Sequence, residues 1–373
     1  IKDFQNIIYK KKEFNVNQLY VDASGIDDMC NSDFSIKAHQ NFLKNFMTKE
    51  SPYRSLLIYH GVGVGKTCSA LTIAENFRDP YARKDKRILI LSSKNIQIGW
   101  KQTIYNPIKG DNQCTGDTFV NSDATTDRQV NALVKQYYEL MAYQSFSNFV
   151  KRMVNSYVLK YPKEEKDIRK KEWIRSYFSN RYIIIDEVHN IRGEHGTDMR
   201  DAVKTIEEVI TYSDNLRLVL LTATPMYNRV TEILWILNMM LLNDKRPILE
   251  KKNIFDKNDE LTPQGAKLIQ DKCRGYVSYL RGENPITFPI RLYPNQIKDR
   301  NGKSLYTNNK MNTLINKSQH PTYNLVGGSI KDNLKFLNLF GSKLHGLQYN
   351  VYKKSIQNII DKDSSIDLDI RGE

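Results

Sequence analysis

Residues 61–67, with the sequence GVGVGKT, have the composition of a turn that binds a triphosphate. Alternating glycines permit left-handed and crowded backbone conformations, so that several N–H groups and the positive end of a helix dipole can face the phosphates. Lys66 can reach the β and γ phosphates, and Thr67 can bind Mg²⁺. With ATP and Mg²⁺ as cofactors, the predicted nucleotide contacts are Gly61, Val62, Gly63, Val64, Gly65, Lys66 and Thr67.

His60 stands where the usual phosphate-binding pattern has its first glycine. The turn does not require glycine at this position if the preceding strand, predicted over residues 55–59, ends there. Strand, turn and helix follow one another in the order that a phosphate site needs. We therefore interpret residues 61–67 as a working nucleotide site rather than as a glycine-rich turn without a ligand.

Two acidic residues, Asp186 and Glu187, follow another apolar run in the sequence YIIIDEVHN. A strand that ends beside a phosphate-binding turn can supply one carboxylate to Mg²⁺ and one to orient or deprotonate the attacking water. We assign Asp186 to the metal together with Thr67, and Glu187 to the water. The predicted catalytic residues are therefore Lys66, Asp186 and Glu187. Capping of a helix is the alternative for paired acids, and the nearby turn disfavours it.

Three further residues have side chains that can relay a hydrogen bond between the ATP site and another surface. His189 lies two residues beyond the acid pair and has two ring nitrogens. Thr222 and Thr224 end another apolar run, in LLTATPM, and their hydroxyls can both donate and accept. We predict that these residues couple hydrolysis to movement.

The chemistry-bearing segments follow apolar runs rich in β-branched residues, at 55–59, 87–93, 182–186 and 217–224. Continuous hydrophobicity is typical of strands that helices cover on both faces of a parallel sheet. Alternation of such strands with helical patterns predicts a doubly wound α/β domain over roughly residues 30–240. Ligands of such sheets bind at the carboxyl ends of the strands, where the polar residues lie.

The amino-acid composition favours binding to polyanionic partners. The chain of 373 residues has 56 Lys and Arg against 42 Asp and Glu, a net charge of +14. This balance suits nucleic acid, although a lysine-rich composition from an AT-rich genome would give the same charge. The sequence shows no membrane-spanning run and no signal peptide, which predicts an intracellular protein.

The cysteines are scattered at Cys30, Cys68, Cys114 and Cys273. None of these spacings is typical of a zinc site or a redox pair. We expect buried thiols in a reducing compartment and no structural zinc.

The segment 151–181 contains ten Lys and Arg against four Asp and Glu. It predicts a helical hairpin or an extended helix. Its charges form either a solvated face or a contact with a phosphate backbone, and the sequence leaves both interpretations open. Beyond residue 245 the chain is polar and turn-rich, and the prolines of residues 283–296 predict an extended segment.

GVGVGKT, DEVH and TATP, in this order and spacing, resemble motifs I, II and III of superfamily 2 helicases and translocases. The resemblance implies a RecA-like P-loop domain. SIKAHQNFLKNF (35–46) resembles the adenine-reading element, which implies Gln40 as the base-reading amide and Lys37 as its helper. ILILSSKNIQIGWKQ (88–102) resembles motif Ia, whose loop touches the nucleic-acid backbone. The residues implicated there are Ser92, Ser93 and Lys94, with Trp100 expected to be a packing residue.

HGVGVGKT and the segments TATPMYNRVTEILWILNMMLLNDKRP and GYVSYLRGENPITFPIRLYP resemble the Swi/Snf-like ATPases of nucleocytoplasmic large DNA viruses, the set that includes poxvirus nucleoside triphosphatase I. This resemblance implies a nucleic-acid-dependent ATPase that translocates on double-stranded DNA in viral transcription. It also implies contacts with viral RNA polymerase or transcription factor subunits, location in the viral factory of the host cytoplasm, packaging in the virion, and no membrane contact.

Three other functions stay open from the sequence. One is an RNA helicase of the same superfamily, because DEVH alone does not select DNA. Another is a promoter-binding transcription factor subunit whose ATPase serves assembly. The third is the motor of a restriction enzyme, for which we find no P-D-x-K nuclease signature.

The expected domain organisation has three parts: an N-terminal extension at 1–30, the first RecA-like lobe at 31–244, and a bridging segment at 245–373. The lobe includes a basic helical insertion at about 150–181. Residues 344–356 resemble the linker that enters a second lobe, whose Q-x-x-R-x-x-R motif would supply an arginine finger. We find no such motif in these residues, so we expect weak ATP binding and slow hydrolysis from this chain.

Overall fold

The computed structural model describes residues 4–17, 34–78, 86–110, 112–119, 122–191, 196–226, 230–280, 301, 313–314, 320–323, 329, 340–341 and 344–362. The chain divides into two compact units, Ile1–Phe288 and Pro289–Glu373. The first unit contains every predicted site residue and is described first. The predicted extended segment 283–296 lies outside the described residues.

A parallel sheet in the spatial order β3-β2-β4-β5-β1-β6 forms the centre of the first unit. Its strands are β1 (Ser55–His60), β2 (Ile88–Leu91), β3 (Tyr138–Met141), β4 (Tyr182–Ile185), β5 (Arg217–Thr222) and β6 (Val277–Leu280). The inner strands β2, β4 and β5 are buried at every position. The predicted doubly wound α/β fold and its four predicted strands are confirmed.

The two edge strands were not predicted from the sequence. In β3, Glu139 interrupts the apolar pattern and only Tyr138 is buried. In β6 no residue is buried. An edge strand pairs on one side only, so its sequence does not need the continuous hydrophobicity that marks an inner strand.

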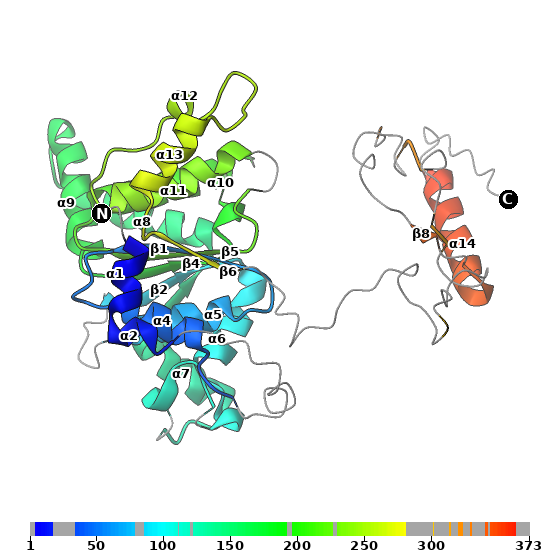
Figure 1. The fold of residues 1–373 in the computed structure, drawn as a ribbon, viewed down its shortest axis with the longest axis horizontal. Helices are drawn as coiled ribbons and strands as arrows, with labels where there is room; N and C mark the ends of the chain where they lie inside the picture. The colour runs from blue at the N-terminus through cyan, green and yellow to red at the C-terminus, as the bar shows by residue number, and fades with distance from the viewer. Residues whose placement is uncertain are drawn as a thin grey trace. The chain divides into compact units, whose positions relative to one another are not determined.

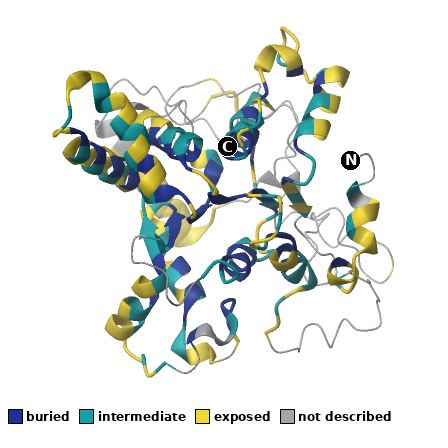
Figure 2. Ribbon diagram, turned by 90° about the vertical axis from the view of Figure 1, so that its left-hand side faces the viewer, coloured by how far each residue is buried: buried dark blue, intermediate teal, exposed yellow. Residues whose placement is uncertain are grey.

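Helices cover both faces of the sheet (Figure 1). On one face, Leu56 and Ile58 of β1 pack with the cluster of α4, α5, α6 and α7. On the other face, Leu57 packs with the cluster of α8, α9, α10 and α11. Figure 2 shows buried residues on the central strands and exposed residues on the outer helix surfaces. This arrangement is the three-layer α/β/α architecture that a parallel sheet requires.

The helices of the first unit begin with α1 (Phe4–Lys10) and α2 (Lys12–Asn15). The layer that contains the phosphate-binding turn consists of α4 (Ala38–Phe46), α5 (Lys66–Ala74), α6 (Gln97–Ile104) and α7 (Asp127–Tyr137). The opposite layer consists of α8 (Tyr143–Val158), α9 (Lys166–Phe178), α10 (Gly196–Tyr212) and α11 (Ile233–Asn243). The helices α12 (Lys251–Ile254) and α13 (Pro263–Lys272) precede β6.

The N-terminal helices are part of this packing. Phe14 of α2 is buried, and its ring centroid lies 5.0 Å from that of Phe42 on α4. Phe4 of α1 makes an edge contact with Phe46, which is also on α4, at 6.4 Å between ring centroids. The predicted N-terminal extension therefore contributes aromatic side chains to the core cluster on the α4 face.

The first unit continues past the predicted domain boundary at residue 244. β6 pairs in parallel with β1 along Leu57–His60, so residues 277–280 complete the sheet. Tyr276, just before β6, is buried against Tyr53 at 5.9 Å between ring centroids. The compact unit accordingly reaches Phe288. We missed this extension because the edge strand has no buried face that would show in the sequence.

The second unit contains β7 (Thr313–Leu314), β8 (Phe340–Gly341) and α14 (Gly346–Lys362) among its described residues. β7 and β8 pair in an antiparallel manner. The segment that resembles a linker, residues 344–356, is helical from Gly346 onward, and Tyr352 is exposed. Within the described residues of the whole chain, no helix is both long and apolar enough to cross a membrane.

The prediction of free thiols is wrong for two cysteines. Cys68 and Cys114 form a disulfide, whereas Cys273 is a free and buried thiol as expected. Cys30 lies outside the described residues. The two bonded cysteines are 46 positions apart in the sequence, a separation without a local motif, and only the packing of α5 against the segment after α6 brings them together.

The predicted basic insertion is a helical hairpin formed by α8 and α9. Six of its ten cations between residues 151 and 181 take part in ion pairs. Arg169 pairs with Glu165 and Glu172 on its own helix, and Lys170 pairs with Glu208 of α10. Except for Arg181, which is buried, the pairing supports the interpretation of these side chains as a charged face rather than as a phosphate contact.

Arg181 anchors the edge strand β3. Its side chain is 1% exposed and pairs with Glu139 of β3. Its Nε also donates to the carbonyl oxygen of Arg87 at 2.8 Å, just before β2. A buried guanidinium requires such partners, because an unpaired buried charge is strongly unfavourable.

We expect Arg181→Met to lower the free energy of unfolding by about 3 kcal/mol, because the change leaves Glu139 without its most buried cation. Urea denaturation measures this loss. Arg175→Met is the matched control, since that guanidinium is 61% exposed in its pair with Asp214 and should contribute less than about 1 kcal/mol. Equal losses in the two variants would contradict the anchoring role.

Candidate functional site

The phosphate-binding turn joins the end of β1 to the start of α5. Gly63 and Gly65 have φ angles of 78° and 86°, in the left-handed region that favours glycine. A side chain at Gly65 would also meet Gln40, because an added Cβ would lie 2.8 Å from the Gln40 Nε2. The turn therefore has a conformation and a packing that glycine allows, and α5 begins at Lys66 with its N-terminus at the turn.

Lys66 donates from Nζ to the carbonyl oxygen of Gly61 at 3.1 Å. This bond holds the ammonium group over the turn. Gly61 also donates its N–H to the carbonyl oxygen of Leu280 at 3.1 Å, at the end of β6. The start of the turn is thus fixed to the edge strand β6 as well as to β1.

The residues expected to read adenine lie directly against the turn. Gln40 is buried, accepts at Oε1 from the backbone N–H of Lys37 at 2.8 Å, and donates from Nε2 to Gly65 at 3.3 Å. Lys37 is exposed at the N-cap of α4. The adjacent His39 ring lies 3.3 Å from the Val64 carbonyl oxygen through its Nε2. In this structure Gln40 connects α4 to the turn.

His60 has a structural role that the sequence did not suggest. Its side chain is buried, and its Nε2 lies 2.9 Å from the Ser278 hydroxyl of β6. The ring also makes an edge contact with His39, at 5.6 Å between centroids. A glycine at this position could not make these contacts, so His60 connects the turn to β6 and α4.

The acid pair follows β4 at the same edge of the sheet. Asp186 is buried, and its Oδ1 accepts from the N–H of Glu187 at 2.9 Å. Its Oδ2 accepts from the indole N–H of Trp100 at 2.7 Å. Glu187 has a φ of 45°, an uncommon conformation for a residue with a side chain, and such strain is concentrated at functional sites.

The predicted coupling residues form a connected set around Glu187. The Nδ1 of His189 lies 3.2 Å from the Glu187 Oε2 and 2.8 Å from the Thr222 hydroxyl oxygen. That hydroxyl oxygen also accepts from the backbone N–H of Thr224 at 3.0 Å. Thr222 is buried, whereas Thr224 is exposed. Thr224 therefore enters the set through its backbone.

A cavity of about 470 Å³ connects the turn and the acid pair. Its walls come from three segments that follow β1, β2 and β4, at the carboxyl ends of the strands, where ligands of such sheets bind. The lining residues are Gly63, Gly65, Lys66, Thr67, Ile96, Gly99, Trp100, Thr103, Asp186 and Glu187. The predicted catalytic residues Lys66, Asp186 and Glu187 thus share one cavity.

The donor set in this cavity suits Mg²⁺. Thr67 offers a hydroxyl and Asp186 a carboxylate, and Mg²⁺ prefers such oxygen ligands together with phosphate oxygens. Each carboxylate oxygen of Asp186 accepts one hydrogen bond within the described residues and has a second lone pair for the metal or its water. Neither this cavity nor any other part of the described residues contains a cluster of three or more His, Cys, Asp or Glu side chains that could hold a metal without other ligands.

Burial raises the pKa of both acidic side chains. For Asp186, the hydrogen bond from Trp100 opposes the effect of burial. For Glu187, the positive charge of Lys66 opposes it. A carboxylate with a raised pKa is a better proton acceptor, which suits the assignment of Glu187 to the attacking water.

The residues expected to touch nucleic acid follow β2. Ser92 is buried and its N–H donates to the carbonyl oxygen of Met141 at 3.1 Å. Ser93 is half-buried, and Lys94 is exposed at the start of the short 3₁₀ helix Lys94–Ile96. Of the three predicted contacts, Lys94 is the most accessible to a ligand.

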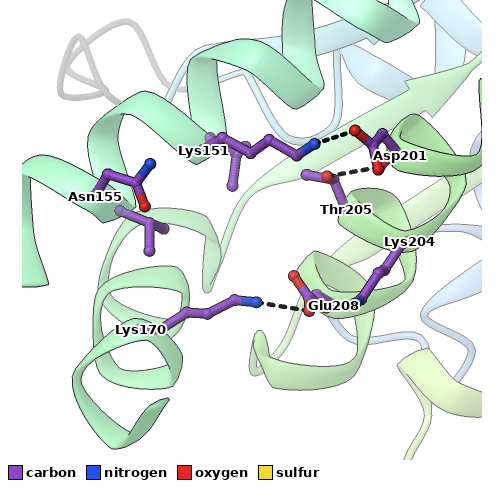
Figure 3. A pocket seen from close by; sticks show the side chains of 9 residues that line it. Lys151, Asn155, Lys170, Asp201, Lys204, Thr205 and Glu208 are labelled. Carbon is purple, nitrogen blue, oxygen red and sulfur yellow. Dashed lines mark hydrogen bonds and ion pairs between the residues drawn. The ribbon is translucent and has the colours of Figure 1, made fainter. Parts of the chain in front are cut away.

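A second cavity, of about 230 Å³, lies among α8, α9 and α10 (Figure 3). Lys151 pairs there with Asp201, and Lys170 pairs with Glu208 at 2.6 Å between Nζ and Oε1. These pairs join different helices. We therefore assign the charges of this cavity to helix packing.

Sequence reasoning missed two contributions to the site. Trp100, expected only to pack, is buried and also bonds to Asp186. Tyr143 of α8 donates its hydroxyl to the backbone carbonyl oxygen of Asp186. No local pattern marks either residue, because their partner lies 86 and 43 positions away.

This sheet and this cavity define a RecA-like P-loop domain. The profile of the family described as "Type III restriction enzyme, res subunit" matches residues 32–227, more than half of the chain, and the chain belongs to this family. The match ends just after the segment with Thr222 and Thr224.

Among curated relatives, a provisionally named ATP-dependent RNA helicase of Acanthamoeba polyphaga mimivirus is 32% identical over 78% of this chain and 27% of its own length. Another of the same virus is 26% identical over 69% of this chain and 43% of its own. A provisionally named helicase of Frog virus 3 is 26% identical over 66% of this chain and 24% of its own length. The chain therefore spans a quarter to less than half of these relatives, and it is a superfamily 2 helicase-type protein that resembles those of large DNA viruses.

Among solved structures, the Sulfolobus solfataricus SWI2/SNF2 ATPase core in complex with dsDNA aligns over 69% of this chain and 47% of that chain. The TM-score of this alignment is 0.37, at 13% sequence identity.

Because His60 is buried, we expect the free energy of unfolding to depend on pH. Burial lowers the pKa of His60 from 6.5 to about 4, and its Nδ1 has no hydrogen-bond partner within the described residues. The unfolded chain therefore takes up this proton at a higher pH than the folded chain, so the free energy of unfolding falls as the pH falls. We expect His60 to account for about 2 kcal/mol of the loss between pH 7.5 and pH 5.

Urea denaturation of His60→Gln at the two pH values tests this expectation, since glutamine does not titrate. The variant should lose stability less steeply on acidification than the original chain. Ser278→Ala serves as the control: it removes the contact with His60 at 2.9 Å but keeps the imidazole, so its pH dependence should be preserved. Parallel pH profiles for His60→Gln and the original chain would contradict the assignment.

Proposed function

We propose that this protein is an ATP-driven motor that acts on nucleic acid, with double-stranded DNA as its track. The observation that carries the proposal is the single cavity that joins Lys66 and Thr67 to Asp186 and Glu187. Family membership supports ATP hydrolysis as the reaction. The net charge of +14 and the resemblance to Swi/Snf-like viral ATPases support a DNA partner.

The proposed reaction is hydrolysis of the γ-phosphoryl bond of ATP by water. Bound Mg²⁺ would neutralise charge on the phosphate oxygens. The Lys66 ammonium group, which donates to Gly61 here, would turn to the β and γ phosphates. Glu187 orients and deprotonates the water, and its contact with His189 holds the carboxylate towards Thr222.

RNA is the second candidate substrate, and the names of two mimivirus relatives favour it. The DNA proposal includes a role in viral transcription, with viral RNA polymerase or transcription factor subunits as partners. It also includes location in the viral factory and packaging in the virion. Promoter preference without ATP would instead favour a binding subunit whose nucleotide serves assembly.

Lys66→Ala should reduce ATP turnover by about 100-fold, because it removes the side-chain cation that faces the transferred phosphoryl group. Glu187→Gln should reduce turnover by about 100-fold or more while nucleotide binding persists, because only the proton acceptor is lost. Phosphate release and the binding of a fluorescent ATP analogue measure the two effects. Lys267→Ala, on the exposed face of α13, is the matched control for loss of a lysine.

The same assay discriminates the substrates when duplex DNA and single-stranded RNA are added in separate reactions at equal nucleotide concentration. Stimulation by duplex DNA alone supports the DNA track, and stimulation by RNA alone replaces it with the RNA helicase. If Lys66→Ala leaves ATP turnover unchanged, ATP is not hydrolysed in the assigned cavity.

Thr222→Val should lower the ratio of stimulated to unstimulated turnover by about tenfold, because it removes the hydroxyl that contacts His189. Thr224→Val is the comparison, since it keeps the backbone N–H that donates to the Thr222 hydroxyl. For this variant the ratio of stimulated to unstimulated turnover should fall much less. If this ratio falls equally in the two variants, the buried hydroxyl is not the coupling group.

A further inference from the structure

Trp100 lies where the helix after β2 meets the acid pair. It belongs to α6, which starts three residues earlier at Gln97 and directly follows the 3₁₀ helix with Lys94. Its ring is 2% exposed in the core cluster on this face of the sheet. The same residue lines the nucleotide cavity.

The indole N–H of Trp100 has a specific acceptor there. It donates to the Asp186 Oδ2 at 2.7 Å, while the other carboxylate oxygen accepts from the Glu187 N–H at 2.9 Å. The two donors come from different segments and bind different oxygens. Together they fix the plane of the carboxylate, because rotation of the group would break one bond or the other.

Packing alone does not account for an indole at this position. A phenylalanine or leucine could fill apolar volume without a buried N–H that needs a partner. Here the partner is a carboxyl group, and hydrogen bonds to carboxylates are among the stronger ones. The bond therefore acts on the one acidic side chain that shares the cavity with Thr67 and Lys66 and is itself buried.

We propose that Trp100 is a positioning residue that holds the Asp186 carboxylate in the orientation in which it binds the Mg²⁺ of Mg²⁺·ATP. This inference rests on the proposed function. Its consequence is that α6 belongs to the metal site as well as to the core. The 3₁₀ helix that starts with the exposed Lys94 is thereby connected to the metal through α6.

The test measures metal affinity rather than turnover. Mn²⁺ substitutes for Mg²⁺, and electron paramagnetic resonance reports the free Mn²⁺ in the presence of a non-hydrolysable ATP analogue. Trp100→Phe should weaken Mn²⁺ binding by about 10- to 100-fold, the usual effect of removing a partner that orients a metal ligand. Binding of the fluorescent analogue without metal, in EDTA, should change far less.

Trp235→Phe is the matched control. Trp235 also donates its indole N–H to a carboxylate, Glu207 Oε1 at 2.8 Å, but it belongs to α11 and does not line the nucleotide cavity. Its replacement removes the same kind of bond and should leave Mn²⁺ affinity unchanged. A general effect of indole loss on stability would appear in both variants.

A second variant covers the case in which Trp100→Phe does not fold. Replacement of Trp100 by β-(3-benzothienyl)alanine keeps the two-ring shape and substitutes sulfur for the N–H group. Weakened Mn²⁺ binding in this variant, with normal thermal unfolding, supports the positioning role. Mn²⁺ affinity within about twofold of the original chain overturns it, because the ring would then act through packing alone.

The outcomes separate this inference from the proposed function. If the original chain binds Mn²⁺ and nucleotide and Lys66→Ala weakens nucleotide binding, the nucleotide site stands, and the Trp100 variants decide the inference independently. If the original chain binds no nucleotide, the proposed function fails and the inference fails with it.

Discussion

The need to satisfy one buried carboxylate organises this domain. Asp186 is buried beside an apolar sheet, where an ionised group is unfavourable unless hydrogen bonds compensate it. Its side chain accepts from Trp100 and from the Glu187 backbone, and its main-chain oxygen accepts from Tyr143. These donors belong to both helical layers. Placement of the Asp186 carboxylate therefore requires that α6 and α8 pack correctly on opposite faces of the sheet.

The strand order brings the remaining groups to that carboxylate. β5 lies between β4 and β1, so the segments after β1 and β4 reach the cavity from the two sides of β5, whose end supplies Thr222. β6 then contributes from the edge, through Leu280 to Gly61 and through Ser278 to His60. The phosphate-binding turn is consequently supported by more of the sheet than its own strand.

The sequence was sufficient to predict the inner strands, the turn, and Lys66, Thr67, Asp186 and Glu187 among the residues that line the cavity, because inner strands need continuous hydrophobicity and the turn needs glycine. It was not sufficient for β3 and β6, which have few or no buried residues. The roles of Trp100, Tyr143 and Ser278 depend on contacts between distant segments. The pairing of Cys68 with Cys114 was missed for the same reason, since proximity across 46 positions is a property of the packed fold.

The bond between Cys68 and Cys114 has a topological consequence for the nucleotide cavity. Cys68 is the residue after Thr67, and the covalent ring that the disulfide closes contains β2 and α6, including Trp100. A wall of the cavity is thus part of a closed loop that starts at the residue after Thr67. Closure of a loop of this length removes about 4 kcal/mol of chain entropy from the unfolded state. The oxidation state of one sulfur pair therefore sets how much conformational freedom this wall gains when the domain unfolds.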